Sequence, residues 1–289
     1  MPRSLLGILA SPRKFGNCEL FVKELYRQLP GEWDLKLVRL PELSIRPCIA
    51  CYQCLFGEME CVVDDDHKRV LNELAACDAY VVAAPTYFLG ANASLKLFLD
   101  RGLSFYGHLD ELWGKPAAGV AIAGIPGMEG QTKLDVEQFL KLTLGDLRAS
   151  EVIYGALPGE IFLTETAKAV AREMAQSLAT EGGASHSADS DARCPLCGGD
   201  TFRFLPEGKV RCMLCSSEGV YRCSPEGVEI RTTAGDHPLF LSYEAAKHHM
   251  EWLRGMKEAF LAKRKELKAI TQQYVQTGQW IRPEKREDT

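Results

Sequence analysis

Short apolar runs of β-forming residues alternate strictly with segments of helical spacing from residue 4 to about residue 179. Each helical segment is long enough to cross back over a sheet, so the alternation predicts parallel strands with helices on both faces. The runs VVAA and GVAIAG carry no polar alternation, as expected of strands buried on both sides. The sequence therefore predicts a doubly wound α/β domain over residues 1–180, built on a five-stranded parallel sheet.

The positions of these strands and helices follow from the same pattern. The predicted strands are Leu5–Ala10, Asp34–Leu40, Ala79–Ala84, Ala117–Ala123 and Val152–Leu157. The predicted helices are Cys18–Gln28, Asp66–Ala76, Ala91–Phe105, Thr132–Arg148 and Thr164–Ala179.

The last third of the chain has a different organisation. Residues 181–192 are rich in Gly, Ser, Ala and Asp, which predicts a linker and a domain boundary. Residues 193–232 form a small segment punctuated by Cys and Gly, with two strand-like runs, TFRFL and GVEIRT. A long helix is predicted within residues 240–276, with Ser242 as its N-cap. Its apolar stripe must pack on the first domain or on a partner subunit, and consists of Ala246, Met250, Leu253, Met256 and Phe260.

The net charge and the length of the apolar runs exclude several classes of protein. A formal net charge of −5 and a pI near 5.8 leave no basic field for nucleic acid. No run approaches the roughly 18 apolar residues of a membrane span, and the N-terminal apolar run is too short for a secretory signal. We therefore expect a cytoplasmic protein without membrane or nucleic-acid partners. Its eleven cysteines are then expected to stay reduced and to serve mainly as metal ligands.

A first group of cysteines occupies one short stretch, PCIACYQCLFGEMEC, with the spacing CxxCxxCx6C. Structural zinc sites generally take their thiolates from two CxxC pairs separated by a dozen or more residues. The compact spacing is instead typical of the ligand runs that wrap an iron–sulfur cubane. An iron–sulfur cluster is favoured over zinc, and reduced structural thiols are the third interpretation. The predicted ligands are Cys48, Cys51, Cys54 and Cys61.

A second group consists of two CxxC pairs separated by fourteen residues, in CPLCGG and CMLCSS. Two turns that present paired thiolates supply a tetrahedral site, as in a zinc ribbon. The predicted zinc ligands are Cys194, Cys197, Cys212 and Cys215, and a rubredoxin-like iron site is the alternative. A structural or docking role is favoured for this module. Cys223 lies outside the pattern and is expected to be buried.

Three loops follow predicted strands and meet at the carboxyl edge of the sheet, where open α/β sheets bind ligands. The first opens a helix and is suited to a mononucleotide phosphate, although an ordinary strand-to-helix turn is equally compatible with it. Its candidate residues are Ser11, Arg13, Lys14, Gly16 and Asn17. The second loop, Pro85–Gly90, offers aromatic rings and backbone amides, and the third, Gly124–Gln131, is rich in glycine. Together the three loops predict a site for a flat heterocycle with a phosphate.

Several of these motifs resemble those of a known protein family. SPRKFGN, PTYFLGANASLKLFLDR and the five-strand alternation resemble the flavodoxin-like NADPH-dependent FMN reductase superfamily, and CIACYQCLFGEMECVVDDD resembles its iron–sulfur flavoprotein branch. The resemblance covers residues 1 to about 180. It implies a [4Fe–4S] cluster on the first cysteine group and an FMN phosphate on Ser11, Arg13, Gly16 and Asn17. It also implies an isoalloxazine flanked by Pro85, Thr86, Tyr87 and Phe88 and by the segment from Gly124 to Gly127.

One position departs from the family pattern. The residue after Asn17 is usually Ser or Thr and here is Cys18, whose thiol is a weaker hydrogen-bond partner for the phosphate. The family also assembles as homodimers or homotetramers, with the flavin near an interface, and the C-terminal helix could contribute to such an interface.

These features predict an FMN- and [4Fe–4S]-containing electron-transfer flavoprotein. A small-molecule or ferredoxin-type donor would supply electrons and a small acceptor would take them, and no catalytic acid or base from the protein is required. Two alternatives remain open. One is an NAD(P)H-dependent FMN or quinone reductase without a cluster, and the other is a non-catalytic redox sensor or scaffold. His67 is assigned no chemistry and is expected to be a solvated helix residue.

Overall fold

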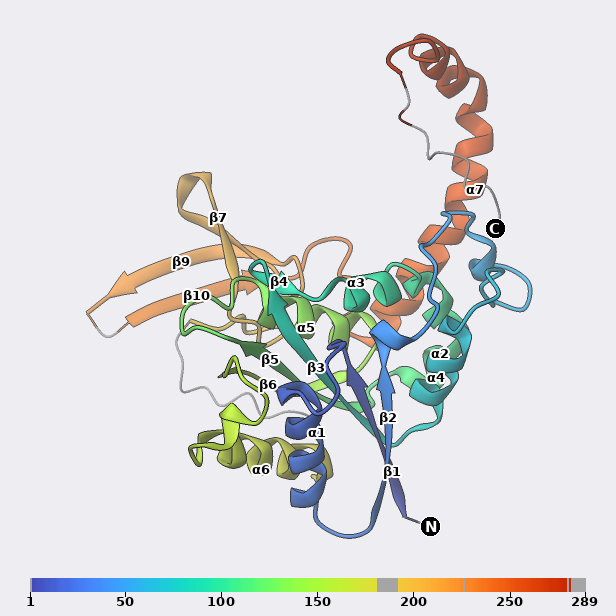
Figure 1. The fold of residues 1–289 in the computed structure, drawn as a ribbon. Coiled ribbons are helices and arrows are strands. Elements are labelled where there is room, and N and C mark those ends of the chain that lie inside the picture. Colours follow the sequence, from blue (N-terminus) through green and yellow to red (C-terminus); the bar gives the residue numbers. More distant parts are fainter. Residues whose placement is uncertain (1, 181–191, 226, 280, 282–289) are drawn as a thin grey trace.

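The computed structural model describes residues 2–180, 192–225, 227–279 and 281 (Figure 1). Five parallel strands form the main sheet in the order β2-β1-β3-β5-β6. The order reverses beside β1, because β2 lies on one side of it and all later strands lie on the other. The strands are β1 (Arg3–Leu9), β2 (Trp33–Arg39), β3 (Ala79–Tyr87), β5 (Pro116–Ala123) and β6 (Asp146–Tyr154). The predicted doubly wound parallel sheet is therefore confirmed, with one addition: the two-residue strand β4 (Gly90–Ala91) pairs antiparallel with β3.

Helices cover both faces of this sheet, as the buried runs in the strands require. On one face, α1 (Asn17–Gln28) and α6 (Thr166–Ala179) bury apolar residues against β1, β3 and β5. The other face is covered by α2 (His67–Ala76), α3 (Ala93–Leu99) and α5 (Thr132–Leu142). Short helices join these elements: η1 (Leu40–Glu42), η2 (Gln53–Leu55), η3 (Gly102–His108), α4 (Leu109–Leu112) and η4 (Glu160–Phe162).

The predicted boundary between the fourth helix and the fifth strand is wrong. The helix ends at Leu142 instead of Arg148, and the strand runs from Asp146 to Tyr154 instead of from Val152 to Leu157. The cause is the buried Tyr80, whose hydroxyl donates to the Leu140 carbonyl at 3.1 Å and lies 2.8 Å from Thr143 Oγ1. Leu144 follows in the left-handed region at φ 66° and turns the chain into the sheet. The third predicted helix likewise ends early, at Leu99, and continues as η3.

The second half of the chain begins with another sheet, of four antiparallel strands in the order β10-β9-β8-β7. The two predicted runs correspond to β7 (Phe202–Leu205) and β10 (Gly227–Thr233). Sequence reasoning missed β8 (Lys209–Cys212) and β9 (Glu218–Ser224), because charged residues interrupt their apolar pattern. Helix η5 (Pro206–Gly208) joins the first two strands. The predicted linker falls almost wholly on residues 181–191, outside the described part of the chain.

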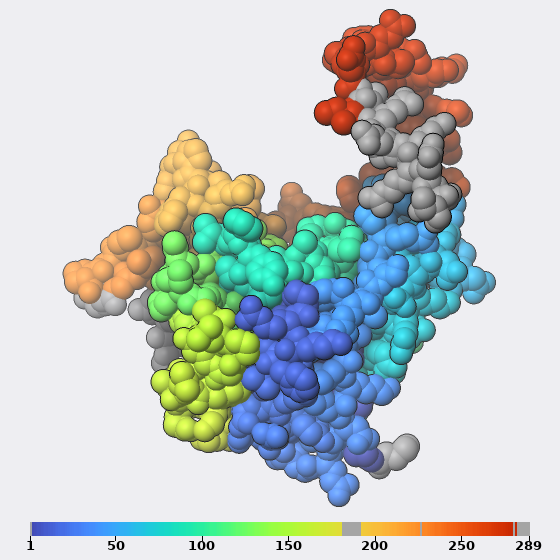
Figure 2. Space-filling view, in the orientation of Figure 1, coloured from blue at the N-terminus to red at the C-terminus, as the bar shows by residue number. Residues whose placement is uncertain are grey.

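This second sheet lies against the first unit. Lys133 Nζ of α5 lies 2.7 Å from Asp200 Oδ2, and Gln138 Nε2 donates to the Met213 carbonyl at 3.0 Å. Leu214 packs on the core beside α5. The hairpin of β9 and β10 extends away from this contact (Figure 2), and Cys223 on β9 is exposed, so the expectation that it would be buried is wrong.

The long helix α7 (Tyr243–Gln272) starts where the sequence predicts. Ser242 Oγ accepts a hydrogen bond from the Ala245 N–H at 3.1 Å, which confirms the N-cap. Ala246 and Met250 are buried against the first unit, whereas Phe260 is 55% exposed. The distal part of α7 projects from the body of the molecule (Figure 2). Within the described residues, no helix combines the length and the apolar character that crossing a membrane requires.

Candidate functional site

A cavity of about 250 Å³ opens at the carboxyl edge of the main sheet, where the loops after β1, β3, β5 and β6 meet. Most residues that the sequence singled out for a flavin lie in its wall. Lys14, Phe88 and Gly127 do not: Phe88 is fully exposed, and Lys14 pairs with Glu42 at 3.7 Å. The lining residues are Ser11, Arg13, Gly16, Asn17, Cys18, Pro85, Thr86, Tyr87, Ile122, Gly124, Gly155 and Ala156.

The first loop is held in place by a buried carboxylate, Glu19. Its Oε2 accepts hydrogen bonds from the Phe15 N–H at 2.7 Å and from Arg39 Nη2 at 2.6 Å, while Lys23 Nζ lies 2.5 Å from Oε1. Burial alone would raise the pKa of Glu19, but the hydrogen bonds from Lys23, the Phe15 N–H and Arg39 lower it to about 2. Arg39 also donates to the carbonyls of Ser11 and Arg13, at 2.9 and 3.0 Å. Contacts within the protein therefore fix the shape of the turn before α1.

Asn17 links this loop to the loop after β6. Its Nδ2 donates to the Gly155 carbonyl at 2.9 Å, and its Oδ1 accepts from the Gly159 N–H at 2.8 Å. The side chain is therefore engaged within the protein, and its backbone N–H is what remains for a ligand at the start of α1. Sequence reasoning missed Gly155 and Ala156, because the predicted last strand extended through both of them. If the predicted strand had ended before Gly155, the sequence would have shown a fourth loop at the same edge of the sheet.

The loop after β3 is a tight hairpin with unusual backbone conformations. Phe88 and Leu89 both have positive φ, 49° and 65°, which non-glycine residues adopt at a cost in free energy. The Leu89 carbonyl accepts a hydrogen bond from the Gln131 N–H at 2.8 Å, so the hairpin is fixed to the loop after β5. Thr86 Oγ1, in the cavity wall, is buried without a hydrogen-bond partner among the described residues. An orphaned hydroxyl in a cavity wall fits a polar group of a bound ligand.

Cys18 occupies the first turn of α1 at the base of the cavity. Burial raises the pKa of its thiol to about 12, and the charge of Arg39 offsets this only in part. The group is therefore a neutral thiol at physiological pH and not a thiolate nucleophile. It can offer a phosphate only a weak S–H donor, as the departure from the family pattern suggests.

The first cysteine group lies on the loop between β2 and α2, which leaves the same edge of the sheet. Cys54 is buried, Cys61 is partly buried, and Cys48 and Cys51 are exposed. Burial raises the pKa of the Cys54 thiol to about 11, and the charges of Cys61, Cys51 and Cys48 add to this shift. The Ala50 N–H points at Cys48 Sγ, 3.4 Å away. Backbone N–H groups directed at sulfur in turns of positive φ are typical of iron–sulfur sites.

A buried ion pair fixes both ends of this loop, which we call the cysteine loop (residues 47–61). Arg101 Nη1 lies 2.6 and 2.7 Å from the two carboxylate oxygens of Asp65, and both side chains are almost fully buried. Asp65 Oδ2 also accepts from the Arg46 N–H at 2.8 Å, and Arg101 Nη2 donates to the Val63 carbonyl at 3.2 Å. The pair therefore forms hydrogen bonds to residues just before Cys48 and just after Cys61. Sequence reasoning missed this contact, because Asp65 and Arg101 lie 36 residues apart.

His67, the first residue of α2, lies beside this ion pair. It is 1% exposed and stacks on Phe98 at 4.6 Å between ring centroids, so the expectation of a solvated residue is wrong. Burial, and next the charge of Arg101, lowers the pKa of His67 to about 4. The neutral imidazole is thus part of the apolar core, because a second positive charge beside Arg101 would be unfavourable.

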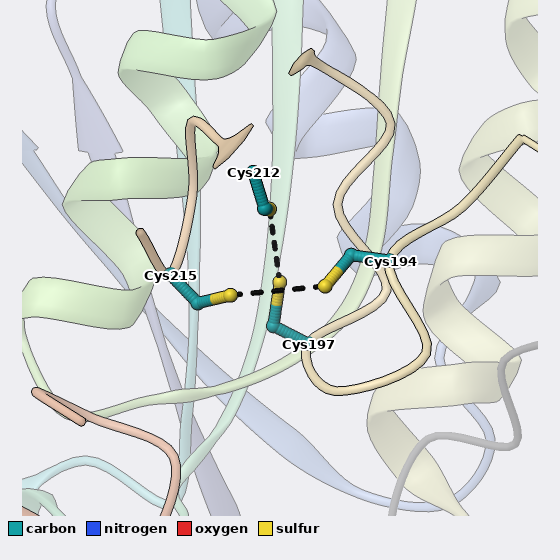
Figure 3. Close-up of side chains that lie close together, drawn as sticks. All are labelled: Cys194, Cys197, Cys212 and Cys215. Atoms are coloured by element: carbon teal, nitrogen blue, oxygen red, sulfur yellow. Dashed lines mark hydrogen bonds between the residues drawn. The ribbon is translucent and has the colours of Figure 1, made fainter. Parts of the chain in front are cut away.

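The second cysteine group converges on one point (Figure 3). Cys194 Sγ lies 3.7 Å from Cys215 Sγ, Cys197 Sγ lies 3.5 Å from Cys212 Sγ, and all four sulfurs lie within 4.8 Å of one another. Four thiolates around one tetrahedral zinc ion would be about 3.8 Å apart, as follows from a Zn–S distance of 2.3 Å. Hydrogen bonding from Cys197 and the other two thiols lowers the pKa of Cys194, which favours a thiolate there. This group is therefore shaped for a single ion.

The two halves of this second site have the same backbone geometry. The Gly198 N–H donates to the Cys194 carbonyl at 2.8 Å, and the Ser216 N–H donates to the Cys212 carbonyl at 2.9 Å. Gly198 and Ser216, which follow each CxxC pair, both have positive φ, 75° and 62°. Each CxxC pair is thus a tight knuckle that directs two sulfurs toward the other knuckle.

The sequence of the first unit matches a known family. Residues 4–150 match the family described as NADPH-dependent FMN reductase, which is half of the chain. The chain belongs to the NADPH-dependent FMN reductase family. As a member of that family it is a flavin-dependent oxidoreductase, and open α/β sheets generally bind ligands at the edge where this cavity lies.

Relatives of this FMN reductase family member are named as iron–sulfur flavoproteins. It is 30% identical over 158 residues to an iron–sulfur flavoprotein of Archaeoglobus fulgidus, a match that covers 54% of this chain and 70% of that protein. It is 33% identical over 98 residues to an iron–sulfur flavoprotein of Methanocaldococcus jannaschii, covering 34% of this chain but only half of that protein.

Similarity of fold extends further along the chain than similarity of sequence. A solved structure of a flavone reductase superposes with a TM-score of 0.71 and 18% sequence identity, over 97% of this chain and all of that one. The FMN reductase family member therefore shares its flavodoxin-like unit, its second sheet and its long helix with a known fold.

Replacing Glu19 by Gln tests how the first loop is held. The carboxylate stabilises the fold above its ordinary pKa of 4.5, and this contribution is lost as the pH falls toward about 2. We expect Glu19→Gln to lose about 3 kcal/mol at pH 7, because Arg39 loses its buried carboxylate partner and keeps only the half-exposed Glu42. Urea denaturation between pH 2 and pH 7 should show the difference between variant and wild type shrinking below pH 4.5.

Glu165→Gln is the matched control, because Glu165 is exposed and its ion pair within the described residues is with the partly exposed Lys168. Its stability curve should follow that of the wild type at all pH values. A constant difference between Glu19→Gln and wild type down to pH 2 would contradict the role given to Glu19.

Replacing Arg101 by Met tests the clamp on the cysteine loop. Removing one partner of a buried ion pair leaves the other charge uncompensated, so we expect a loss of about 3 to 5 kcal/mol in urea denaturation. Lys96→Met, which removes an exposed ion pair with Asp100, should cost less than about 1 kcal/mol. Equal losses of stability in the two variants would contradict the role of the Asp65–Arg101 ion pair in holding the cysteine loop.

Proposed function

We propose that the chain is an electron-transfer flavoprotein that holds FMN in the cavity at the sheet edge and a [4Fe–4S] cluster on the cysteine loop. It would pass electrons between a one-electron donor and a small acceptor. The observation that carries the proposal is the CxxCxxCx6C loop that Asp65 and Arg101 clamp at the same sheet edge as the flavin cavity. The names of the relatives support the same reading.

The residues of the cavity fit a flavin mononucleotide. The phosphate would sit at the start of α1, near the side chains of Ser11 and Arg13 and the backbone of Gly16 and Asn17. The ring system would lie between the Pro85–Tyr87 segment and Gly124, within reach of the orphaned Thr86 hydroxyl. Phe88 and Gly127 would contribute only from outside the cavity wall, and the neutral Cys18 would contact the phosphate weakly.

The two cysteine groups suit different inorganic centres. Sulfurs within 4.8 Å of one another, as in the second group, surround a single ion, for which we propose zinc. A cubane binds one thiolate at each of four iron corners, so its ligands must stand further apart than those of a single ion. Among the described residues, Cys48, Cys51, Cys54 and Cys61 do not form so compact a group, and the proposal of a cluster on them rests on their CxxCxxCx6C spacing and on the names of the relatives.

Electron transfer needs little acid–base chemistry from the protein. A cluster passes single electrons while FMN accepts one or two, so the pair can couple a one-electron donor to a two-electron acceptor. The protein supplies a rigid phosphate loop through Glu19 and Arg39 and a clamped ligand loop through Asp65 and Arg101. A small molecule or a ferredoxin-type protein would serve as the donor.

We also propose a division of labour along the chain. Residues 1–180 carry the flavin and the cluster, residues 193–232 form a zinc ribbon, and residues 240–276 supply the long helix. The ribbon would be structural, because its sulfurs are largely buried and its contacts are with α5 of the first unit. A forty-residue module gains much of its folding free energy from such a metal.

The rim of the flavin cavity supports assembly into a homodimer or homotetramer. Exposed apolar side chains gather on the loops of this edge, which is unusual for a free surface. They are Tyr87, Phe88, Leu89, Ile125, Met128 and Leu157. We expect light scattering to give at least twice the mass of 32.0 kDa for the wild type and a smaller mass for Phe88→Ser. A monomeric wild-type protein would contradict the assembly.

Metal and flavin analysis tests the proposed function directly. Protein purified without oxygen should contain iron and sulfide in equal amounts, with one zinc and one FMN per chain. Cys51→Ala should lose iron and sulfide but keep zinc and FMN, and Cys197→Ala should lose zinc but keep iron. Each substitution removes one ligand from one group and leaves the other group intact.

The outcomes separate this proposal from its alternatives. Wild-type protein with FMN but without iron or sulfide would favour an NAD(P)H-dependent FMN or quinone reductase. A full cluster with no electron transfer to any small acceptor would favour a redox sensor or scaffold. Loss of iron from Cys197→Ala and of zinc from Cys51→Ala would reverse the two metal assignments.

A further inference from the structure

The long helix α7 reaches the cysteine loop with one side chain, Arg254. Its Nε donates to the Leu55 carbonyl at 2.9 Å, its Nη2 lies 3.1 Å from Met59 Sδ, and its Nη1 lies 2.8 Å from Glu251 Oε1. The contacts with Leu55 and Met59 join residues nearly two hundred positions apart in the sequence. One guanidinium thus holds both the end of η2 and the turn before Cys61.

Apolar packing surrounds this contact. Met250, one turn before Arg254, is buried in a small cluster with Leu55 and Tyr106, and Met59 and Leu253 pack on its edge. The loop also approaches η3 closely: a Cβ added to Gly107 would lie 2.8 Å from the Met59 carbonyl oxygen. The segment that carries Cys54 is therefore enclosed between η3 and α7.

The cysteine loop needs such support because its backbone is strained. Ala50, Tyr52 and Met59 all have positive φ, between 52° and 58°, although none is glycine. Conformations of this kind persist only where surrounding contacts impose them. Cys51 and Cys54 lie between or beside these residues, so the direction of their thiols depends on the contacts that hold the turns.

A second cation of α7 stands beside the loop. Lys257 Nζ lies 5.7 Å from the Phe56 ring centroid, and the side chain lines a hollow of about 610 Å³ together with Cys61. Reduction of a cluster adds negative charge, which nearby positive charge stabilises. The side chains of α7 can therefore influence both the shape of the ligand loop and the energy of an electron on it.

We propose that Arg254 is a positioning residue for the iron–sulfur ligands, and that α7 is the strap that holds the cysteine loop in its ligating conformation. The proposal rests on the proposed function, because it requires a cluster on this loop. It gives the C-terminal helix a role in the redox centre of the first unit. The Arg254 guanidinium fixes Leu55 and Met59, which lie between Cys54 and Cys61, and its charge raises the reduction potential of the cluster.

The test uses the full chain with flavin and metals, purified without oxygen. Arg254→Met removes the fork and the charge, and Arg254→Lys keeps the charge alone. Arg264→Met is the control, because Arg264 is exposed on the same helix beyond the contact. The readouts are iron and sulfide per chain, the rate of iron loss to a chelator, and the midpoint potential followed by electron paramagnetic resonance.

Arg254→Met should lose iron to the chelator at least fivefold faster than wild type, and its remaining cluster should titrate at a lower potential. Arg254→Lys should also lose iron faster but keep a potential near that of wild type, and Arg264→Met should match wild type in both. If Arg254→Met fails to fold, the iron-loss rate of Arg254→Lys decides. Wild-type rates and potentials in the Arg254 variants would overturn this proposal and leave the proposed function intact, whereas wild-type protein without a cluster would overturn both.

Discussion

The buried ion pair between Asp65 and Arg101 is the contact on which the arrangement of the cysteine loop depends. A loop with several residues at positive φ has little tendency to close by itself, and this pair joins its two ends through Arg46 and Val63. The pair is stable in the interior because its hydrogen bonds come from the same backbone that it organises. It also explains the neutral His67, which lies between the pair and the aromatic core.

The flavin cavity is built on the same principle, with charged residues inside the protein holding loops of the sheet edge. Glu19 and Arg39 hold the first loop, Asn17 joins it to the loop after β6, and Leu89 joins the hairpin to the loop after β5. All of these contacts are made within the protein, so they hold the loops of the cavity in place. The two cysteine groups differ in their shape and in the contacts that hold them. One is a pair of symmetric knuckles sized for a single ion, and the other is a single wider loop that depends on contacts from α2, η3 and α7.

Much of the fold and of the candidate site could be predicted from sequence, because the signals involved are local. Buried strands show as apolar runs, CxxC pairs show their spacing, and Ser242 caps its helix through its own side chain. Contacts between distant residues could not be predicted. The end of α5 is set by Tyr80, which lies sixty residues earlier in the sequence. The pairing of Asp65 with Arg101 and of Leu55 with Arg254 likewise appears only when the chain is folded. Gly155 and Ala156 were missed for a different reason, since the predicted strand hid the loop that they begin.

Anomalous diffraction from crystals grown without oxygen tests the central claim most directly, which is that the clamped loop holds iron while the two knuckles hold zinc. Data collected at the iron and zinc absorption edges should give an iron peak enclosed by Cys48, Cys51, Cys54 and Cys61 and a separate zinc peak between Cys194, Cys197, Cys212 and Cys215. An iron peak at the knuckles, or a cysteine loop without iron whose thiols point apart, would contradict the account.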